Sequence, residues 1–207
     1  GGRHLMREAA LAHARQLVAE GADILDIGGE STRPGATPVG VQEELDRVLP
    51  VVEALRGAPV PLSIDTCKPE VMRASLAAGA LMINDINALQ STEALAAVAA
   101  SDAAVCLMHK QGSPASMQVE PHYQDVMAEV KDFLLARMAA VQAAGIARER
   151  IVIDPGFGFG KTLAPVNEGV ARDGWLYLLT LRLVPLFPFW LVNLLMGLTP
   201  MGAARFY

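Results

Sequence analysis

Short apolar runs alternate with longer segments of helical spacing along most of this chain. The apolar runs cover residues 24–28, 60–64, 81–84, 103–107 and 151–153. Between and before them, segments such as 40–56 repeat their apolar residues every three or four positions, which is typical of a helix with one buried face. The other expected helices cover residues 4–20, 69–78, 91–100 and 123–144. This alternation predicts βα units around a parallel sheet.

Residues that commonly begin or end helices stand at the boundaries of the expected helices. Gly21, Gly57 and Gly79 each follow an expected helix, at the position where a glycine commonly ends one. Pro69 stands in the first turn of its helix, and Ser91 is a natural N-cap. The boundaries of the expected helices are therefore supported by local chemistry as well as by periodicity.

The number of units favours a barrel over an open sheet. Five expected strands each follow a helix, and the commonest closed arrangement of such units is the eight-stranded barrel of about 250 residues. We therefore expect an α/β fold that is a partial (β/α)8 TIM barrel with about five βα units. A doubly wound open sheet is the alternative, but no Gly-x-Gly-x-x-Gly turn follows the first strand, which argues against dinucleotide binding.

Composition and charge exclude several classes of partner. The chain has 207 residues, a net charge of −5 and no basic run, so nothing indicates a nucleic acid or an anionic membrane surface. Cys67 and Cys106 are expected to be free thiols, and without a secretory leader they favour a reducing, cytoplasmic location. No His/Cys cluster has the spacing of a metal site, so we expect no metal held by the protein alone.

Polar residues gather where the apolar runs end. Asp65 follows the second run, Asn84 ends the third and Asp154 ends the fifth. Two carboxylates and an amide at the mouths of parallel strands suit a heterocycle with adjacent N–H groups, because charge-assisted hydrogen bonds are about twice as strong as neutral ones. Helix capping or an internal salt bridge is the competing interpretation.

Two loops add further candidates. Thr32-Arg33-Pro34 follows the first strand, and the Arg33 guanidinium can hold a phosphate or a carboxylate in a forked geometry. The segment Asp154-Pro-Gly-Phe-Gly-Phe-Gly-Lys161 places glycines at alternate positions, which lets a flat ligand approach the backbone while Phe159 provides an apolar wall.

Taken together, these motifs resemble those of the dihydropteroate synthases, in the pterin-binding family. The matching segments are Gly28-Gly-Glu-Ser-Thr-Arg-Pro-Gly35, Ser63-Ile-Asp-Thr-Cys-Lys-Pro69, Ile83-Asn-Asp-Ile86, Leu107-Met-His109 and Asp154-Pro-Gly-Phe-Gly-Phe-Gly-Lys161. They occur in the family's order across roughly residues 1–163. The resemblance implies a transferase of folate biosynthesis that condenses p-aminobenzoate with 6-hydroxymethyl-7,8-dihydropterin pyrophosphate and releases pyrophosphate.

The resemblance also implies roles for individual residues. Asp65, Arg33 and Thr32 would form the catalytic set, with Arg33 on the pyrophosphate. The substrate-binding residues would be Asn84, Asp154, Met108, Phe159, Gly158 and Pro34. Mg²⁺ would be bound mainly through the pyrophosphate of the substrate. The partners would be these small molecules, and the homodimer of the family is doubtful here.

The two ends of the chain depart from the family pattern. The sequence opens after the family's first strand and loop, and residues 164–207 carry none of its later motifs. Between residues 175 and 198 the only charged residue is Arg182, and Pro185 and Pro188 interrupt the most apolar part. We therefore expect a pterin-binding barrel domain at 1–163, a non-family apolar tail at 164–207 produced by a frameshift or fusion, and impaired activity. A membrane span in the tail is less favoured.

Two other functions stay open at this point. A pterin-binding methyltransferase domain would share the barrel and the acidic residues that bind the pterin. The Ser-Thr-Arg-Pro-Gly loop and the Phe-Gly-Phe-Gly turn nevertheless favour the synthase. A fragment that binds pterin without catalysis is the alternative from another class. Calorimetry with a pterin, with and without its pyrophosphate, distinguishes these possibilities.

Overall fold

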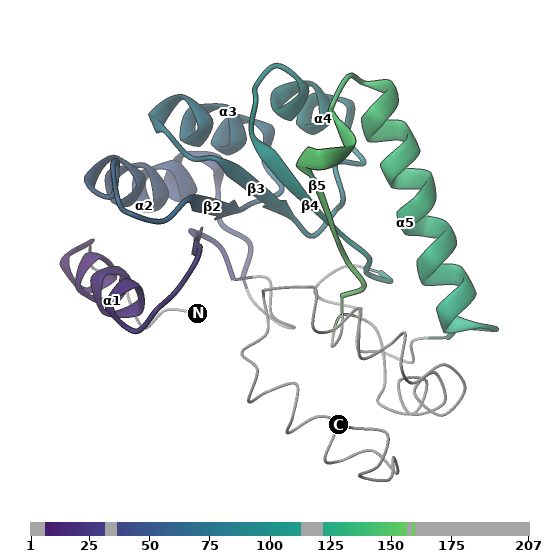
Figure 1. The fold of residues 1–207 in the computed structure, drawn as a ribbon, viewed down its shortest axis with the longest axis horizontal. Coiled ribbons are helices and arrows are strands. Elements are labelled where there is room, and N and C mark those ends of the chain that lie inside the picture. Colours follow the sequence, from purple (N-terminus) through teal and green to yellow (C-terminus); the bar gives the residue numbers. More distant parts are fainter. Residues whose placement is uncertain (1–6, 32–36, 113–121, 157–158, 160–207) are drawn as a thin grey trace, which may run out of the picture.

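The structure is a computed structural model that describes residues 7–31, 37–112, 122–156 and 159. Five helices and five strands alternate through these residues (Figure 1). In chain order they are α1 Arg7–Ala19, β1 Leu25–Gly28, α2 Val41–Ala54, β2 Leu62–Asp65, α3 Pro69–Ala78, β3 Met82–Asp85, α4 Thr92–Ala99, β4 Ala104–Met108, α5 Val126–Ala143 and β5 Ile151–Asp154, with a 3₁₀ turn at Arg148–Arg150 before β5.

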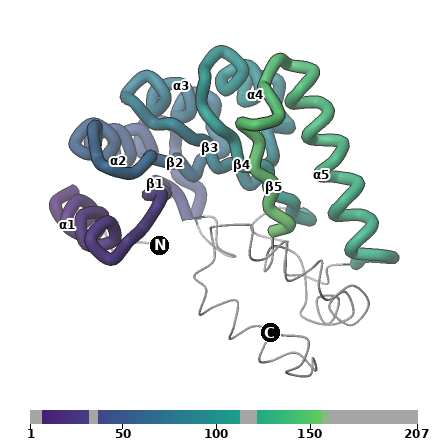
Figure 2. The backbone as a smooth tube through the Cα atoms, viewed as in Figure 1, coloured from purple at the N-terminus to yellow at the C-terminus, as the bar shows by residue number. Residues whose placement is uncertain are grey.

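The five strands form one parallel sheet in the order β1-β2-β3-β4-β5 (Figure 2). Sequence order and spatial order are therefore the same, as they are around a (β/α)8 barrel, and the helices α2 to α5 each connect two neighbouring strands. The expected α/β fold with about five βα units of a TIM barrel is confirmed. All five strands and all five helices lie within a few residues of the boundaries expected from the sequence.

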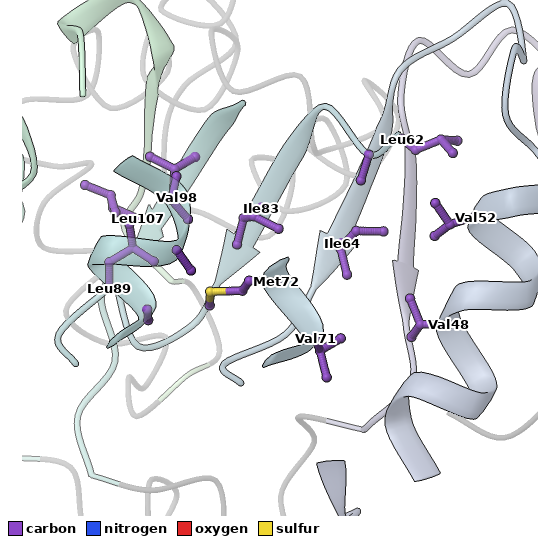
Figure 3. Close-up of a cluster of buried hydrophobic side chains, with 14 of the residues drawn as sticks. Val48, Val52, Leu62, Ile64, Val71, Met72, Ile83, Leu89, Val98 and Leu107 are labelled. Carbon is purple, nitrogen blue, oxygen red and sulfur yellow. The ribbon is translucent and has the colours of Figure 1, made fainter. Parts of the chain in front are cut away.

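The apolar core lies between the sheet and the helices that cover one of its faces. Figure 3 shows Ile64 and Ile83 of the strands together with the helical side chains Val52 and Met72. These four residues have exposures of 0%. Burial of such side chains contributes about 1.5–3 kcal/mol each and is the main stabilising term of this layer.

The other face of the sheet, which we call the inner face, carries a different set of side chains. Successive residues of a strand point to opposite faces, so the residues between the core positions belong to it. It comprises Asp26, Gly28, Ser63, Asp65, Met82, Asn84, Ala104, Cys106, Met108, Val152 and Asp154. Most polar residues of the five strands are thus concentrated on the inner face, towards the carboxyl ends of the strands.

Local chemistry explains where several elements begin and end. Gly79 ends α3 with a left-handed φ of 112°, and Gly21 and Gly57 also have positive φ, as expected from the sequence. Ser91 caps α4, and its Oγ accepts a hydrogen bond from the N–H of Ala94 at 3.0 Å. Within the described ranges, no helix is long and apolar enough to cross a membrane. Residues 164–207, expected to form an apolar tail, lie outside those ranges.

Gly156, just after β5, is a position that only glycine fits. Its φ is +67°, and a Cβ atom built there would lie 1.9 Å from the carbonyl oxygen of His109. The backbone N–H of His109 in turn donates to the carbonyl of Asp154 at 2.9 Å. The connections after β4 and β5 therefore approach each other at a backbone-to-backbone distance that excludes any side chain.

We predict that Gly156→Ala destabilises the fold much more than Gly145→Ala. Gly145 has a similar φ of +95° but open space where a Cβ atom would lie, so its substitution costs only the left-handed conformation, about 1–2 kcal/mol. Gly156→Ala must in addition displace the His109 backbone. Urea denaturation of both variants measures the difference, and equal losses would contradict the close approach.

Candidate active site at the carboxyl ends of the strands

The strand register brings Asp65 and Asn84 side by side. Asp65 of β2 is paired with Gly28 of β1 on one side and with Asn84 of β3 on the other. Gly28 has no side chain, and a Cβ atom there would lie 3.4 Å from the Cβ of Asp65. This distance is an ordinary van der Waals contact, so Gly28 and Asp65 lie side by side on the inner face.

Asp26 is a member of the site that the sequence analysis did not select. The Asn84 amide donates from Nδ2 to Oδ2 of Asp26 at 3.1 Å, across the intervening strand β2. This contact orients the Asn84 amide and leaves its side-chain oxygen as an acceptor. The alternation of side chains along β1 could have identified Asp26, because it lies two residues before Gly28 and therefore on the same face of the sheet.

Asp154 approaches the same region from β5. Its Oδ1 accepts a hydrogen bond from the backbone N–H of Gly156 at 2.7 Å, which holds the carboxylate at the start of the glycine-rich turn. Met108 is paired with Asp154 in the sheet, is 3% exposed, and lies against the Gly156 turn. Phe159 is half-buried, and its backbone N–H donates to the carbonyl of Gly156 at 3.1 Å.

The Cys106 thiol lies within electrostatic reach of these carboxylates. Burial, and after it the negative charges of Asp154, Asp26, Asp65 and Asp85, raise the pKa of Cys106 to about 12. Carboxylates from β1, β2 and β5 therefore all act on a fully buried group of β4. Both cysteines are free, as expected, although Cys67 is only partly buried.

The pKa of the Asp65 carboxyl is raised above its usual value. Burial is the largest cause, and together with the nearby charges of Asp26, Glu44, Asp85 and Glu30 it raises the pKa from 3.8 to about 7. Its Oδ1 is buried and has no hydrogen-bond partner among the described residues. A buried carboxylate oxygen without a donor is destabilising unless a ligand supplies one, so Asp65 is the strongest candidate for a ligand contact.

Asp85 has a structural role instead. It lies on the helix side of the sheet, is 1% exposed, and accepts hydrogen bonds from the backbone N–H groups of Asn87 and Leu89, both at 2.8 Å. These bonds stabilise a turn in which Ala88 and Leu89 have positive φ. A hollow beside Cys67 and Asp85 therefore belongs to the outer layer and not to the inner face.

The remaining candidates from the sequence lie outside the described residues. These are Thr32, Arg33, Pro34 and Gly158. Among the residues that are described, no group of three His, Cys, Asp or Glu side chains is arranged to hold a metal ion. The site in view is thus a cluster of two half-buried carboxylates, an amide and a third, more exposed carboxylate, on the floor formed by Cys106 and Met108.

The fold is part of a barrel of parallel βα units, and acidic and amide side chains lie at the carboxyl ends of its strands. This arrangement is typical of TIM-barrel enzymes. The family model for pterin binding enzymes matches residues 1–172. The chain therefore belongs to the pterin binding enzyme family.

Individual relatives agree with this assignment. The chain is 51% identical over 173 residues to a dihydropteroate synthase of Escherichia coli K12, which covers 83% of this chain and 61% of the relative. It resembles the structure of Burkholderia cenocepacia dihydropteroate synthase complexed with 7,8-dihydropteroate, with a TM-score of 0.71, 59% identity and coverage of 76% of this chain and 56% of the other.

A third relative is the Xanthomonas albilineans dihydropteroate synthase solved with 4-aminobenzoic acid. Its TM-score is 0.74 at 55% identity, with coverage of 83% of this chain and 61% of the other. The chain thus spans less than two thirds of the length of these three relatives. The family match ends at residue 172, and the expected division of this chain at residue 163 stays a prediction.

The raised pKa of Asp65 predicts a specific dependence of stability on pH. Because the folded state holds this proton more tightly than the unfolded chain does, its contribution to stability is complete below about pH 4 and is lost as the pH rises through about 7. Asp65→Asn removes this loss, so the variant should be more stable than the parent at pH 8, by up to roughly 1.4 kcal/mol per unit of pKa shift.

Urea denaturation at pH 4 and at pH 8 measures this effect. The difference between Asp65→Asn and the parent should grow between the two values of pH. Asp102→Asn removes the same charge from an exposed position and serves as the control. A gain in stability that is the same at both values of pH would show that the folded state does not raise the pKa of Asp65.

Proposed function

We propose that the inner-face cluster binds the nitrogen-rich edge of a pterin and that the chain carries the pterin half of a dihydropteroate synthase site. The observation that carries this proposal is the buried Oδ1 of Asp65, which has no donor among the described residues. It stands beside the Asn84 amide, which Asp26 orients. The complexes of the two relatives with dihydropteroate and 4-aminobenzoic acid support it.

The chemistry of a pterin matches this arrangement. Its pyrimidine ring presents adjacent N–H donors beside a carbonyl, and a carboxylate that accepts two such donors forms charge-assisted hydrogen bonds. Asp154, fixed by the Gly156 N–H, and Asn84 would complete the contacts to the edge of the ring. Met108 and Phe159 would supply apolar contacts to the ring or to the neighbouring amine.

The proposed reaction is condensation of 6-hydroxymethyl-7,8-dihydropterin pyrophosphate with p-aminobenzoate. The bond between the pterin methylene carbon and the pyrophosphate oxygen breaks, and pyrophosphate leaves with the electron pair. The amine nitrogen then attacks the methylene carbon and loses a proton. Asp65 in its ionised form would stabilise the positive charge that develops on the pterin, because a fixed carboxylate in a water-poor site acts strongly on such a charge.

The leaving group requires positive charge. Arg33 would contact the pyrophosphate, as the resemblance to the family implies. The carboxylates of the inner face are of the oxygen-ligand type that Mg²⁺ prefers, and a magnesium ion bound mainly through the phosphate oxygens of the substrate and water would need only one or two of them. When bound, Mg²⁺ would neutralise charge on the departing pyrophosphate.

We predict that the chain binds 6-hydroxymethyl-7,8-dihydropterin and that Asp65→Asn weakens the binding roughly ten- to hundredfold, the loss expected for hydrogen bonds to a charged group. Titration calorimetry measures both affinities. Because Asp65→Asn is expected to preserve or increase stability at pH 8, weaker binding there cannot be attributed to unfolding. Asp102→Asn, on the surface, should bind like the parent.

Pyrophosphate release in the presence of p-aminobenzoate tests the reaction itself. Release that depends on both substrates and on Asp65 supports the synthase. Binding of the pterin without any release supports a non-catalytic pterin-binding chain, and transfer of a methyl group from a methylated pterin supports the methyltransferase alternative. Absence of pterin binding by the parent chain would overturn the proposal.

A further inference from the structure

The connection that follows β3 begins with a tight turn, directly after the site residue Asn84 and its neighbour Asp85. Ala88 and Leu89 in this turn both have left-handed backbone conformations, with φ of 52° and 49°. Such conformations are unfavourable for residues that carry a Cβ atom. They persist only where the surrounding structure imposes them, often beside functional sites. The turn therefore depends on specific interactions that hold its backbone.

Asp85 holds the N–H groups of the turn. Its carboxylate accepts hydrogen bonds from the backbone of Asn87 and Leu89, and its own carbonyl accepts one from the N–H of Ala88 at 2.9 Å. Because Asp85 is the residue after Asn84, the group that organises these donors is joined covalently to a residue of the candidate site. The donors of the turn are thus satisfied from the end of β3.

Arg137 of α5 holds the carbonyl groups of the same turn. Its guanidinium donates from Nε to the carbonyl oxygen of Ala88 at 2.9 Å and from Nη2 to that of Leu89 at 2.6 Å. A guanidinium presents its donors in a rigid planar fork, so one side chain can fix two successive peptide groups. These two bonds join α5 to the turn across 48 residues of sequence.

Packing gives the turn little room to rearrange. The side chains of Ala88 and Leu89 are completely buried and belong to the apolar core. The helix α5 is held in the same core through Val141. Close-packed interiors transmit strain instead of absorbing it, so a displacement of the two carbonyls would pass along the backbone towards Asn84.

Asn84 is the residue at which such a displacement would matter. The pairing of β3 with β2 ends at Asn84 and Asp65, and the Asn84 side chain donates to Asp26 at 3.1 Å. A hydrogen bond weakens steeply outside a narrow range of distance and angle. A small shift of the Asn84 backbone would therefore disturb this bond and the contact that Asn84 is proposed to make with a ligand.

We propose that Arg137 is a positioning residue of the candidate site: it fixes the carbonyls of the turn after β3 and thereby keeps the Asn84 amide where it can contact the edge of a pterin. The inference rests on the proposed function, in which Asn84 is one of the groups that contact this edge. Arg137 belongs to α5 and acts through the backbone of the turn, without contact to the ligand.

Arg150 provides a matched control within the same chain. Its guanidinium donates from Nε to the carbonyl of Ala103 at 2.9 Å and from Nη2 to those of Ser101 and Ala103, both at 2.6 Å. Arg150 is half-buried, as Arg137 is. The carbonyls that it holds precede β4, so they lie at the amino end of the strand and away from Asn84. Removal of Arg150 therefore costs contacts of the same kind without affecting the candidate site.

Titration calorimetry of the full chain with 6-hydroxymethyl-7,8-dihydropterin tests the inference. Arg137→Met should weaken binding of this pterin roughly fivefold or more, because small displacements of a positioned group can cost large factors. Arg150→Met should bind it within about twofold of the parent, as expected for a distant, independent change. Urea denaturation of both variants measures what each substitution costs in stability, so that an effect on position is distinguished from a general loosening of the fold.

A double-mutant cycle with Asn84 shows whether Arg137 acts through this residue. In an Asn84→Ala background the amide is absent, so Arg137→Met should change the affinity for the pterin by less than about twofold. A general effect on the fold would instead weaken binding by the same factor in both backgrounds.

Arg137→Lys tests the inference even if Arg137→Met does not fold. A lysine keeps the positive charge and can donate to one carbonyl, but it has no planar fork that reaches two. Arg137→Lys should therefore bind the pterin more weakly than the parent, and this loss should also disappear in the Asn84→Ala background.

The possible outcomes separate this inference from the proposed function. A loss that occurs with the Arg137 variants, is absent from Arg150→Met and disappears in the Asn84→Ala background supports both. If the Arg137 variants bind like the parent, lose no more affinity than Arg150→Met, or lose it equally with and without Asn84, the inference is wrong while the proposed function stands. If the parent does not bind the pterin, the proposed function is wrong and this inference falls with it.

Discussion

Successive side chains of a β-strand point to opposite faces, and the whole molecule depends on this constraint. In a parallel sheet with matched register, it allows one face to hold an apolar core while the other holds a polar site, without either interrupting the other. Ile64 and Ile83 pack against helices, and the residues that follow them, Asp65 and Asn84, lie together on the inner face. A shift of register by one residue would bury the carboxylate in the core and expose the isoleucine.

The same constraint makes formation of the site energetically unfavourable. Asp65 is largely removed from water, burial and several other carboxyl groups raise its pKa to about 7, and no described residue donates to its Oδ1. The apolar layer behind the sheet offsets this cost. A site that is destabilising when empty gains binding energy when a ligand supplies the missing donors, so the instability of the free form and the affinity for a ligand have one physical origin.

The sequence predicted the fold well because its signals are local. Apolar spacing, the glycines after helices and the Ser91 cap each depend on a few neighbouring residues, and the structure confirms the elements that they predicted. Asp65 and Asn84 could be predicted as site residues for a similar reason, since the carboxyl ends of parallel strands meet at one edge of the sheet. The contact between Asn84 and Asp26 was missed because it joins β1 and β3 and depends on register, which a single strand does not reveal. The ion pairs of Lys68 could not be predicted from the sequence, because they depend on the burial of Glu44 in the folded chain, where Gly29 lies closely against α2.

Electrostatics explain why the ion pairs of Lys68 with Glu30 and Glu44 lie where they do. A pterin edge demands carboxylates at the strand ends, whereas a pyrophosphate demands cations nearby, and the two demands oppose each other over a short distance. Lys68 does not resolve that opposition by binding the anion, because Glu30 and Glu44 already neutralise its charge. Its charge instead keeps these two carboxylates from adding their full repulsion to a site that Asp26, Asp65 and Asp154 already make acidic.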